Sequence, residues 1–179
     1  MTQIPPETPA APKDRPAPPA EALLCFNLYA ASHAFIRLYA PYLEGIGITY
    51  PQFLVLLSLQ DRDGQGVGEL GEALAMETNT LSPLLKRMQA AGLLDRVRSS
   101  QDERRVEIRL TEAGRARAAE AAQVPGCIAR DSGMTEDSYH QTLATLRDLR
   151  AQIARTAARG RGAEWGAERG AEKGEGAGA

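Results

Sequence analysis

The chain has 179 residues, a mass of 19.2 kDa and a formal net charge of −2. This length suits one ordinary domain with a sizeable core, and no apolar run approaches the roughly 20 residues of a membrane span. Cys25 and Cys127 are the only cysteines, which excludes a disulfide scaffold and a zinc site built on Cys-x-x-Cys pairs. We expect a cytoplasmic protein that has no metal, no cofactor and no membrane segment.

Both ends of the chain differ in composition from the middle. Residues 1–20 are rich in Pro and Ala, and residues 159–179 repeat Gly, Ala, Glu and Arg without an aliphatic side chain larger than alanine. Such segments cannot bury enough apolar surface to offset their ordering entropy. We therefore expect disordered tails at 1–20 and 159–179, and one folded domain over residues 21–158.

Two helices are predicted in the first part of this domain. Apolar residues between positions 21 and 43 keep to one stripe of a helix, which Pro41 should bend or end. Thr49 and Gln52 have the spacing of a capping box at the start of a second helix. Residues 53–59 of that helix are apolar nearly all round, so we expect it in the core.

A helix-turn-helix is predicted next. Residues 61–66 have the composition of a loop, and the apolar spacing that follows indicates a third short helix up to Met76. A turn near residues 77–79 leads into a fourth helix that ends at Ala91, where Gly92 suits the left-handed position after a helix. The fourth helix is expected to bury one face, made of Leu81, Leu84, Leu85 and Met88.

A β-hairpin and two more helices follow. Residues 94–98 and 106–110 alternate apolar and charged side chains, as two strands of a hairpin do. Thr111 should begin a fifth helix that the Pro125–Gly126 pair breaks. A last helix begins at Thr135, and its apolar face has no cover of its own, so we expect that face to dock on a second protomer. The face comprises Tyr139, Leu143, Leu146, Leu149 and Ile153.

This order of elements predicts a mainly α-helical fold with a small β-hairpin wing, a winged helix-turn-helix. We expect a DNA-binding lobe over residues 49–110 and dimerisation helices over residues 21–44 and 112–157. A symmetric homodimer would then address a near-palindromic double-stranded DNA operator, with half-sites roughly 34 to 36 Å apart.

The segment from Thr78 to Arg109 carries local positive charge. It has seven Lys or Arg against four Asp or Glu, a balance of +3, and phosphate attraction acts over only roughly 8 to 10 Å. Hydroxyl and basic side chains of the fourth helix can bond phosphates or base edges, and the hairpin tip can reach a minor groove. The predicted DNA contacts are Thr80, Ser82, Lys86, Arg87, Asp102, Arg104 and Arg105, with Asp102 placed to hold the Arg104 guanidinium.

Five motifs stand out: YPQFLVLL from Tyr50, TLSPLLKR from Thr80, AGL from Ala91, DERRV from Asp102 and LTEAG from Leu110. They resemble the MarR family of dimeric winged-helix repressors, and the resemblance runs over about residues 23–153. Within that family, LCFNLYAAS from Leu24 and RLYAP from Arg37 are similar to the organic-hydroperoxide sensors called OhrR. One departure is Glu-Thr-Asn at residues 77–79, where that branch more often has an Asp-Ser-Gly type of turn.

The resemblance implies a transcriptional repressor, not an enzyme, that leaves its operator when Cys25 is oxidised by an organic hydroperoxide. Cys25 and Tyr29 adjoin on one helix face at i and i+4, whereas Tyr39 lies farther along, about 21 Å down the axis. If Tyr39 contacts the thiol, as the resemblance implies, it comes from the second subunit. Tyrosine hydroxyls would then donate hydrogen bonds to the thiolate, the form of cysteine that attacks a peroxide.

Cys127 follows the Pro125–Gly126 pair, in a segment that we expect to be mobile. It is a candidate to resolve oxidised Cys25 as an intersubunit disulfide. The alternative is a passive thiol that a low-molecular-weight thiol caps.

An alternative for the whole protein is a MarR-type repressor whose dimer cleft binds a phenolic or lipophilic ligand without covalent chemistry, with Cys25 incidental. A thiol peroxidase would gain nothing from a wing. A general DNA-coating protein would show little preference for an operator over random DNA.

Overall fold

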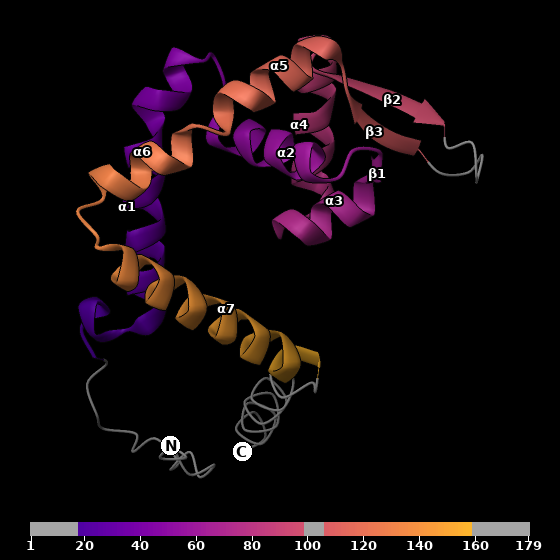
Figure 1. Ribbon diagram of the computed structural model, residues 1–179. Helices are drawn as coiled ribbons and strands as arrows, with labels where there is room; N and C mark the ends of the chain where they lie inside the picture. The colour runs from indigo at the N-terminus through magenta and orange to yellow at the C-terminus, as the bar shows by residue number, and fades with distance from the viewer. Residues whose placement is uncertain (1–17, 99–105, 159–179) are drawn as a thin grey trace, which may run out of the picture. The chain divides into compact units, whose positions relative to one another are not determined.

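The computed structural model describes residues 18–98 and 106–158, and it divides into two compact units after Val124 (Figure 1). The first unit holds a 3₁₀ turn (Ala20–Ala22), helices α1 (Leu24–Gly45), α2 (Tyr50–Asp61), α3 (Val67–Leu74), α4 (Thr78–Ala90) and α5 (Glu112–Ala121), and strands β1 (Gln65–Gly66), β2 (Leu94–Arg98) and β3 (Val106–Leu110). The second unit holds all but the first residue of α6 (Val124–Asp131) and the whole of α7 (Glu136–Ala158). Within the described ranges, no helix has both the length and the hydropathy to cross a bilayer. Most of both predicted tails and the hairpin tip at 99–105 lie outside these ranges.

A winged helix-turn-helix forms the centre of the first unit, as the sequence predicted. The Gln52 side chain accepts a hydrogen bond from the Thr49 N–H at 2.8 Å, which confirms the capping box of α2. Residues of α2 that the sequence placed in the core are buried: Phe53, Val55, Leu56 and Leu59. In Figure 1 the β2–β3 hairpin projects from the helices of this lobe, as a wing does.

A short strand that the sequence did not predict completes the wing. β1 pairs antiparallel with β3, with Gln65 opposite Ile108 and Gly66 opposite Glu107, and the sheet order is β1-β3-β2. The prediction of an irregular loop throughout residues 61–66 is therefore wrong at its end. Two residues are too few to display a period of two, and their pairing depends on a strand far along the chain.

Asp63 fastens the loop before β1 to the rest of the lobe. Its Oδ1 accepts hydrogen bonds from the backbone N–H groups of Leu110 at 2.9 Å and Gly64 at 3.1 Å. Its Oδ2 pairs with Arg115 Nη1 at 3.2 Å. One carboxylate therefore joins the loop to the end of β3 and to α5.

Gln65 closes the C-terminal end of α2. The residue is 3% exposed, and its Nε2 donates to the carbonyl oxygens of Ser58 and Arg62 at 2.8 Å each. The Ser58 carbonyl also accepts from the Arg62 N–H at 3.1 Å, so the Gln65 amide adds a second hydrogen bond at this helix end and has its own buried donor satisfied.

The fourth helix begins earlier than its sequence indicated. Glu77 is the N-cap of α4, and Thr78 and Asn79 already belong to the helix, so the predicted turn at residues 77–79 is wrong for two of its three residues. The predicted inner face of α4 is buried, and Gly92 has the expected positive φ of 71°. Helix α4 is therefore longer than predicted, and Thr78 and Asn79 in its first turn are exposed.

Helix α1 continues past its proline. Pro41 lies inside α1, which runs to Gly45. Of the two predicted effects, a bend or an end of the helix, the end is therefore wrong. An internal proline costs about 3 kcal/mol, and packing beyond it offsets this cost, because Leu43 is only 2% exposed. The helix ends before Gly47, which has a φ of 70°.

The break between α5 and α6 also differs from expectation. Thr111 caps α5 as predicted, with its hydroxyl accepting from the Gly114 N–H at 2.9 Å. However, α5 ends at Ala121, and the Pro125–Gly126 pair lies in the first turn of α6 instead of breaking the chain. Proline is tolerated there because the first N–H groups of a helix have no partner to lose.

The start of α5 approaches the end of α4 so closely that only glycine fits at position 114. A Cβ on Gly114 would overlap the carbonyl oxygen of Leu93. That carbonyl cannot easily move, because it accepts from the Thr111 N–H at 3.2 Å, and the Thr111 hydroxyl donates to the carbonyl of Gly92 at 2.7 Å.

We expect Gly114→Ala to lower the free energy of unfolding by about 2 to 3 kcal/mol, as overpacking of a fixed site does. Denaturant unfolding of reduced protein measures the change. Gly68→Ala is the matched control, since Gly68 lies in α3 and a Cβ built there has nothing within 4 Å. The Gly68→Ala protein should be as stable as the wild type or more stable. A Gly114→Ala protein within about 0.5 kcal/mol of the control would contradict the close approach.

Candidate functional site

The outer face of α4 carries most of the predicted DNA contacts that the structure describes. Thr80, Lys86 and Arg87 are exposed, and Ser82 is half-buried. All four belong to one helix that is anchored by its buried face, so their relative positions are fixed by the fold. The remaining predicted contacts lie outside the described residues: Asp102, Arg104 and Arg105.

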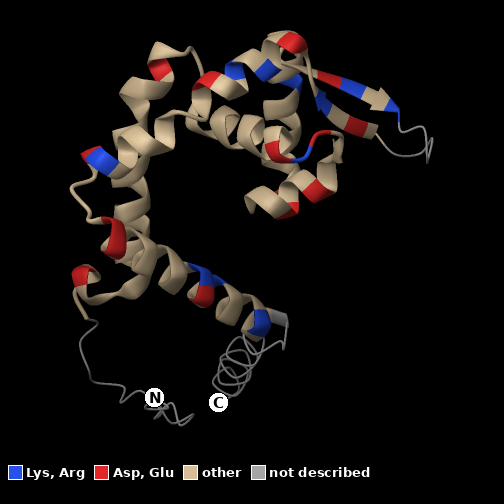
Figure 2. Cartoon of the chain, viewed as in Figure 1, with Lys and Arg blue, Asp and Glu red and all other residues tan. Residues whose placement is uncertain are grey.

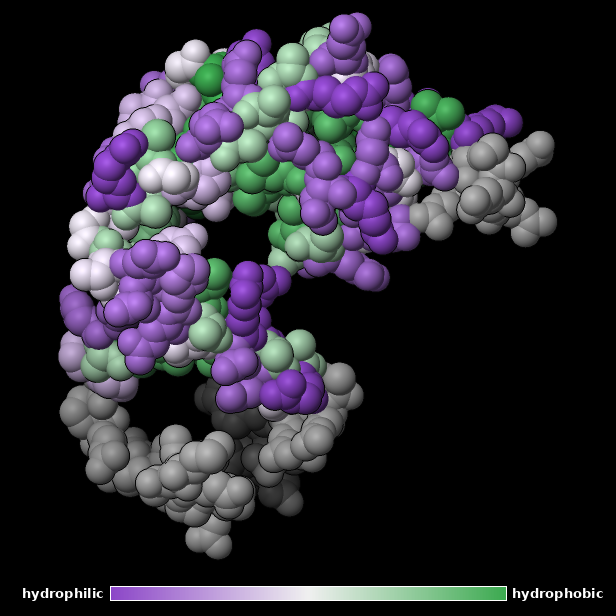
Figure 3. All heavy atoms as spheres, viewed as in Figure 1, coloured by the Kyte–Doolittle hydropathy of each residue, from purple (hydrophilic) through white to green (hydrophobic). Residues whose placement is uncertain are grey.

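The wing strands carry both acidic and basic residues, marked red and blue along β2 and β3 in Figure 2. The visible face of the wing is mostly hydrophilic (Figure 3). On β3, Arg109 Nη2 and Glu107 Oε2 form an ion pair at 2.8 Å. On β2, the Nε and Nη2 atoms of Arg96 are buried and have no hydrogen-bond partner. In the sequence, Arg96 counted only toward the positive charge of the segment from Thr78 to Arg109, whereas the structure shields two of its nitrogens from solvent.

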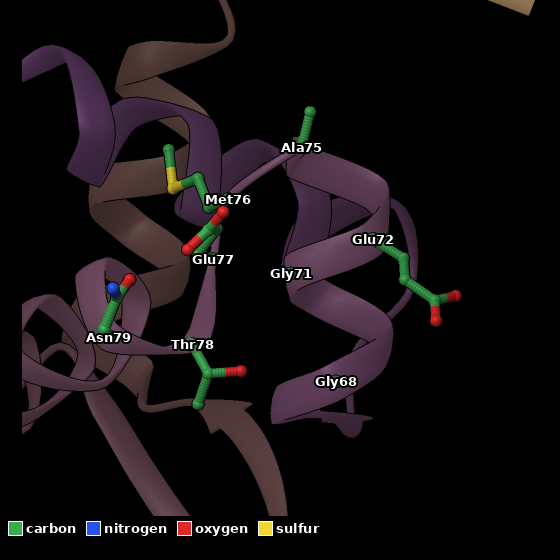
Figure 4. Close-up of a pocket in the computed structure, with 8 residues that line it drawn as sticks. All are labelled: Gly68, Gly71, Glu72, Ala75, Met76, Glu77, Thr78 and Asn79. Atoms are coloured by element: carbon green, nitrogen blue, oxygen red, sulfur yellow. The ribbon is translucent and has the colours of Figure 1, made fainter. Parts of the chain in front are cut away.

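A cleft separates the two helices of the helix-turn-helix (Figure 4). Its volume is about 630 Å³, and its lining includes Gly68 and Gly71 of α3 and Thr78 and Asn79 of α4. Figure 4 shows Thr78 and Asn79 on the α4 side, with the Glu72 carboxylate pointing away from α4. The first turn of the reading helix therefore borders open space.

Cys25 lies in the first turn of α1 and is exposed. The N–H groups of a first turn have no partner within the helix. Large apolar side chains near Cys25 are exposed as well, including Leu24 and Tyr29 at 63% each and Phe26 at 38%. A thiol thus lies within an apolar surface that the described part of one protomer leaves in contact with water.

Tyr29 is four residues from Cys25 on the same helix, as the sequence required. Its ring packs against the His33 ring, with centroids 4.2 Å apart.

An aromatic cluster joins α1 to α2. The ring of Tyr39 lies 5.2 Å from that of Tyr50 and 5.3 Å from that of Phe53, measured between centroids. Burial raises the pKa of Tyr50 above its usual value, so its hydroxyl stays protonated and able to donate. The sequence reasoning named Tyr39 but missed Tyr50, whose position directly before Pro51 at the start of α2 was the available signal.

A second link ties the end of α1 to α5. Arg117 Nη1 donates to the carbonyl oxygen of Ile46 at 2.5 Å and pairs with Glu120 Oε2 at 3.2 Å. The turn after α1 is thereby attached to the helix that also binds Asp63 through Arg115. Movement of α1 would therefore act on the DNA-binding lobe through α5 as well as through α2.

Cys127 is half-buried and helical, in α6. The prediction of a helix breaker directly before Cys127 is therefore wrong, because Pro125–Gly126 lies in the first turn of α6. Cys25 and Cys127 are both free thiols and belong to different units.

Comparison with known proteins places this fold in a family. A model of the SarA/Rot transcriptional regulators matches residues 37–120. Over 129 residues the chain is 41% identical to the organic hydroperoxide resistance transcriptional regulator of Bacillus subtilis, covering 72% of this chain and 88% of that one. The chain belongs to the MarR-like winged-helix family of transcriptional regulators. Members of this family bind DNA to regulate transcription and are not enzymes.

Two further relatives support this assignment. The regulator TtmR of Methylorubrum extorquens is 41% identical over 133 residues, which are 74% of this chain and 68% of TtmR. Reduced AbfR of Staphylococcus epidermidis, solved bound to DNA, is similar with a TM-score of 0.61 and 32% identity, covering 73% of this chain and 89% of AbfR.

Proposed function

We propose that this MarR-like regulator is a homodimeric repressor that leaves a near-palindromic operator when organic hydroperoxides oxidise Cys25. The observation that carries the proposal is the position of Cys25, exposed in the first turn of α1 within an apolar surface. The 41% identity to the organic hydroperoxide resistance regulator of Bacillus subtilis supports it. AbfR, solved in reduced and in overoxidised forms, supports a redox response within the family.

The homodimer is supported by apolar faces that one protomer leaves exposed. On α1, Leu24 is 63% exposed and Phe35 37%, and on α7, Ile153 is 57% exposed and Leu146 38%. Contiguous apolar surface of this kind commonly marks an interface between subunits. A second copy of the chain would bury both faces and bring two reading helices to one duplex.

The dimer would also complete the thiol site. α1 is one continuous helix from Leu24 to Gly45, so Cys25 and Tyr39 of one protomer are about 21 Å apart along its axis. Tyr39 and Tyr50 of the partner subunit would therefore supply the phenol hydroxyls near Cys25. Together with the first-turn N–H groups of α1, they provide hydrogen-bond donors for a thiolate.

Oxidation then follows ordinary thiol chemistry. The Cys25 thiolate attacks one peroxide oxygen, the O–O bond breaks, and the alkoxide that leaves takes up a proton from solvent to become an alcohol. Sulfur loses two electrons and becomes a sulfenic acid, while the peroxide is reduced. Apolar neighbours such as Leu24 and Phe26 favour an organic hydroperoxide over hydrogen peroxide by burying its hydrocarbon part.

DNA contact is assigned to the outer face of α4 and to the wing. Thr80 and Ser82 bond phosphates or base edges, and Lys86 and Arg87 attract phosphates. Asp102, Arg104 and Arg105 at the hairpin tip complete the proposed surface.

We expect Lys86→Ala and Arg87→Ala to weaken binding to all duplexes alike, because phosphate contacts carry no base information. Each should lower the slope of log affinity against log salt by about 1. Fluorescence anisotropy on operator and scrambled duplexes at several salt concentrations measures the affinity for each duplex and its dependence on salt. Arg130→Ala, which removes an exposed cation from α6, should leave the affinity and the salt slope unchanged. An altered sequence preference at an unchanged salt slope would argue against a phosphate role.

Cys25→Ser tests the redox switch. Reduced wild type and Cys25→Ser should bind the operator equally, and cumene hydroperoxide should release only the wild type, because a hydroxyl forms no sulfenic acid. Gel-shift titration with graded peroxide measures the release. Equal release of both proteins would instead favour a repressor whose dimer cleft binds a phenolic or lipophilic ligand without covalent chemistry.

Cys127 is proposed as the thiol that resolves the sulfenic acid. Attack of the Cys127 thiol on the Cys25 sulfenic acid forms a disulfide and releases water. After stoichiometric cumene hydroperoxide, a non-reducing gel should show a dimer-sized band from the wild type, and Cys127→Ser should abolish the band. If the wild type shows no such band, Cys127 is a passive thiol.

A further inference from the structure

The most outward residue of the first turn of α4 is one that the DNA-contact prediction left out. At about 100° per residue, Asn79 lies roughly 170° from the middle of the buried face of α4. By the same geometry, Thr80 and Ser82 lie only about 90° and 110° from that middle. Asn79 is exposed, so it faces a bound duplex more directly than either hydroxyl residue.

Lys86 shares this outward stripe with Asn79. The two residues are roughly 150° and 170° from the middle of the buried face and about 10 Å apart along the axis. A cation on the same stripe, attracted by phosphate, would hold the first turn of the helix against the groove. Asn79 thus lies where recognition helices contact base edges, near the N-terminus.

The surroundings of Asn79 disfavour a phosphate contact. Glu77, the N-cap of α4, is exposed and places a carboxylate beside this turn. No Lys or Arg precedes Lys86 within α4. Base edges, which are neutral, are therefore the part of the duplex that this turn can approach at least electrostatic cost.

The Asn79 amide matches one base better than the others. The Thr80 hydroxyl donates to Asn79 Oδ1 at 3.3 Å, which orients the amide and leaves a second lone pair on Oδ1. An amide offers one acceptor and two donors, which suit the N6 amino group and N7 of adenine in the major groove. Guanine presents two acceptors there and is read by Arg or Lys, which this turn lacks.

We propose that Asn79 is a specificity-determining residue that reads adenine in each half of the operator. The proposal rests on the proposed DNA-binding function. It adds the base that is recognised, adenine, and the atoms that are contacted, N6 and N7. It concerns which sequence is bound, not how oxidation releases it.

Selection from a library of random duplexes tests the assignment. Reduced wild type should select an adenine at one position in each half-site, and Asn79→Ala should reduce that selection about tenfold or more, as loss of a bidentate base contact does. Asn79→Asp, which can only accept hydrogen bonds, should shift the preference to cytosine, whose N4 amino group donates. Gln89→Ala, which removes the same amide from the exposed last turn of α4, should leave the preference unchanged.

The possible results distinguish a failure of the Asn79 assignment from a failure of operator binding. If wild type selects a defined operator and Asn79→Ala selects the same bases, or weakens binding to every duplex equally, Asn79 does not read adenine. Retention of adenine by Asn79→Asp would overturn the assignment too. If wild type selects no sequence at all, operator binding itself fails. Thermal unfolding of each variant confirms that the exposed substitutions leave the lobe folded.

Discussion

The unbroken length of α1 is the constraint on which the proposed switch depends. Because one helix carries both Cys25 and Tyr39, no rotation of side chains can bring the thiol and this phenol of the same protomer together. The helix persists through Pro41, and the ring contacts of Tyr39 with Tyr50 and Phe53 fix its far end to α2. A thiol site that uses these phenols would therefore need a second protomer, and the proposed chemistry at the thiol would act on the subunit interface.

Several contacts tie the elements of the winged helix-turn-helix to one another. Asp63 joins the loop before β1 to β3 and α5, and Gln65 closes the end of α2. Gly114 lets α5 lie directly against the carbonyl of Leu93, which lies between α4 and β2. The start of α5 is therefore held at the junction of α4 and the wing, where the same carbonyl accepts from the Thr111 N–H. Since both α2 and α5 are attached to the end of α1, through the aromatic cluster and through Arg117, a displacement of α1 would tilt the lobe instead of deforming it.

Local sequence patterns were sufficient for the fold. The apolar run of α2, the capping residues Thr49 and Thr111, and Gly92 after α4 each act within a few residues, and the structure confirms them. Two errors occurred at prolines, since Pro41 and Pro125 disfavour a helix by themselves but are tolerated where packing or a first turn compensates. A third was the start of α4, which begins at Thr78 and not after a turn at residues 77–79. β1 depends on pairing with a strand distant in sequence, and the Tyr39–Tyr50 contact joins two different helices, so no local pattern indicated either pairing.

Pro83 within α4 has a consequence for hydration of the recognition surface. Proline has no N–H, so the backbone carbonyl four residues earlier, that of Asn79, lacks its usual partner in the helix. The helix backbone therefore leaves this oxygen available to solvent, and a water held there would travel with the helix into the groove, where such waters can bridge protein and base. Recognition of the operator would then include a solvent molecule carried by the backbone, and the affinity would respond to water activity as well as to salt.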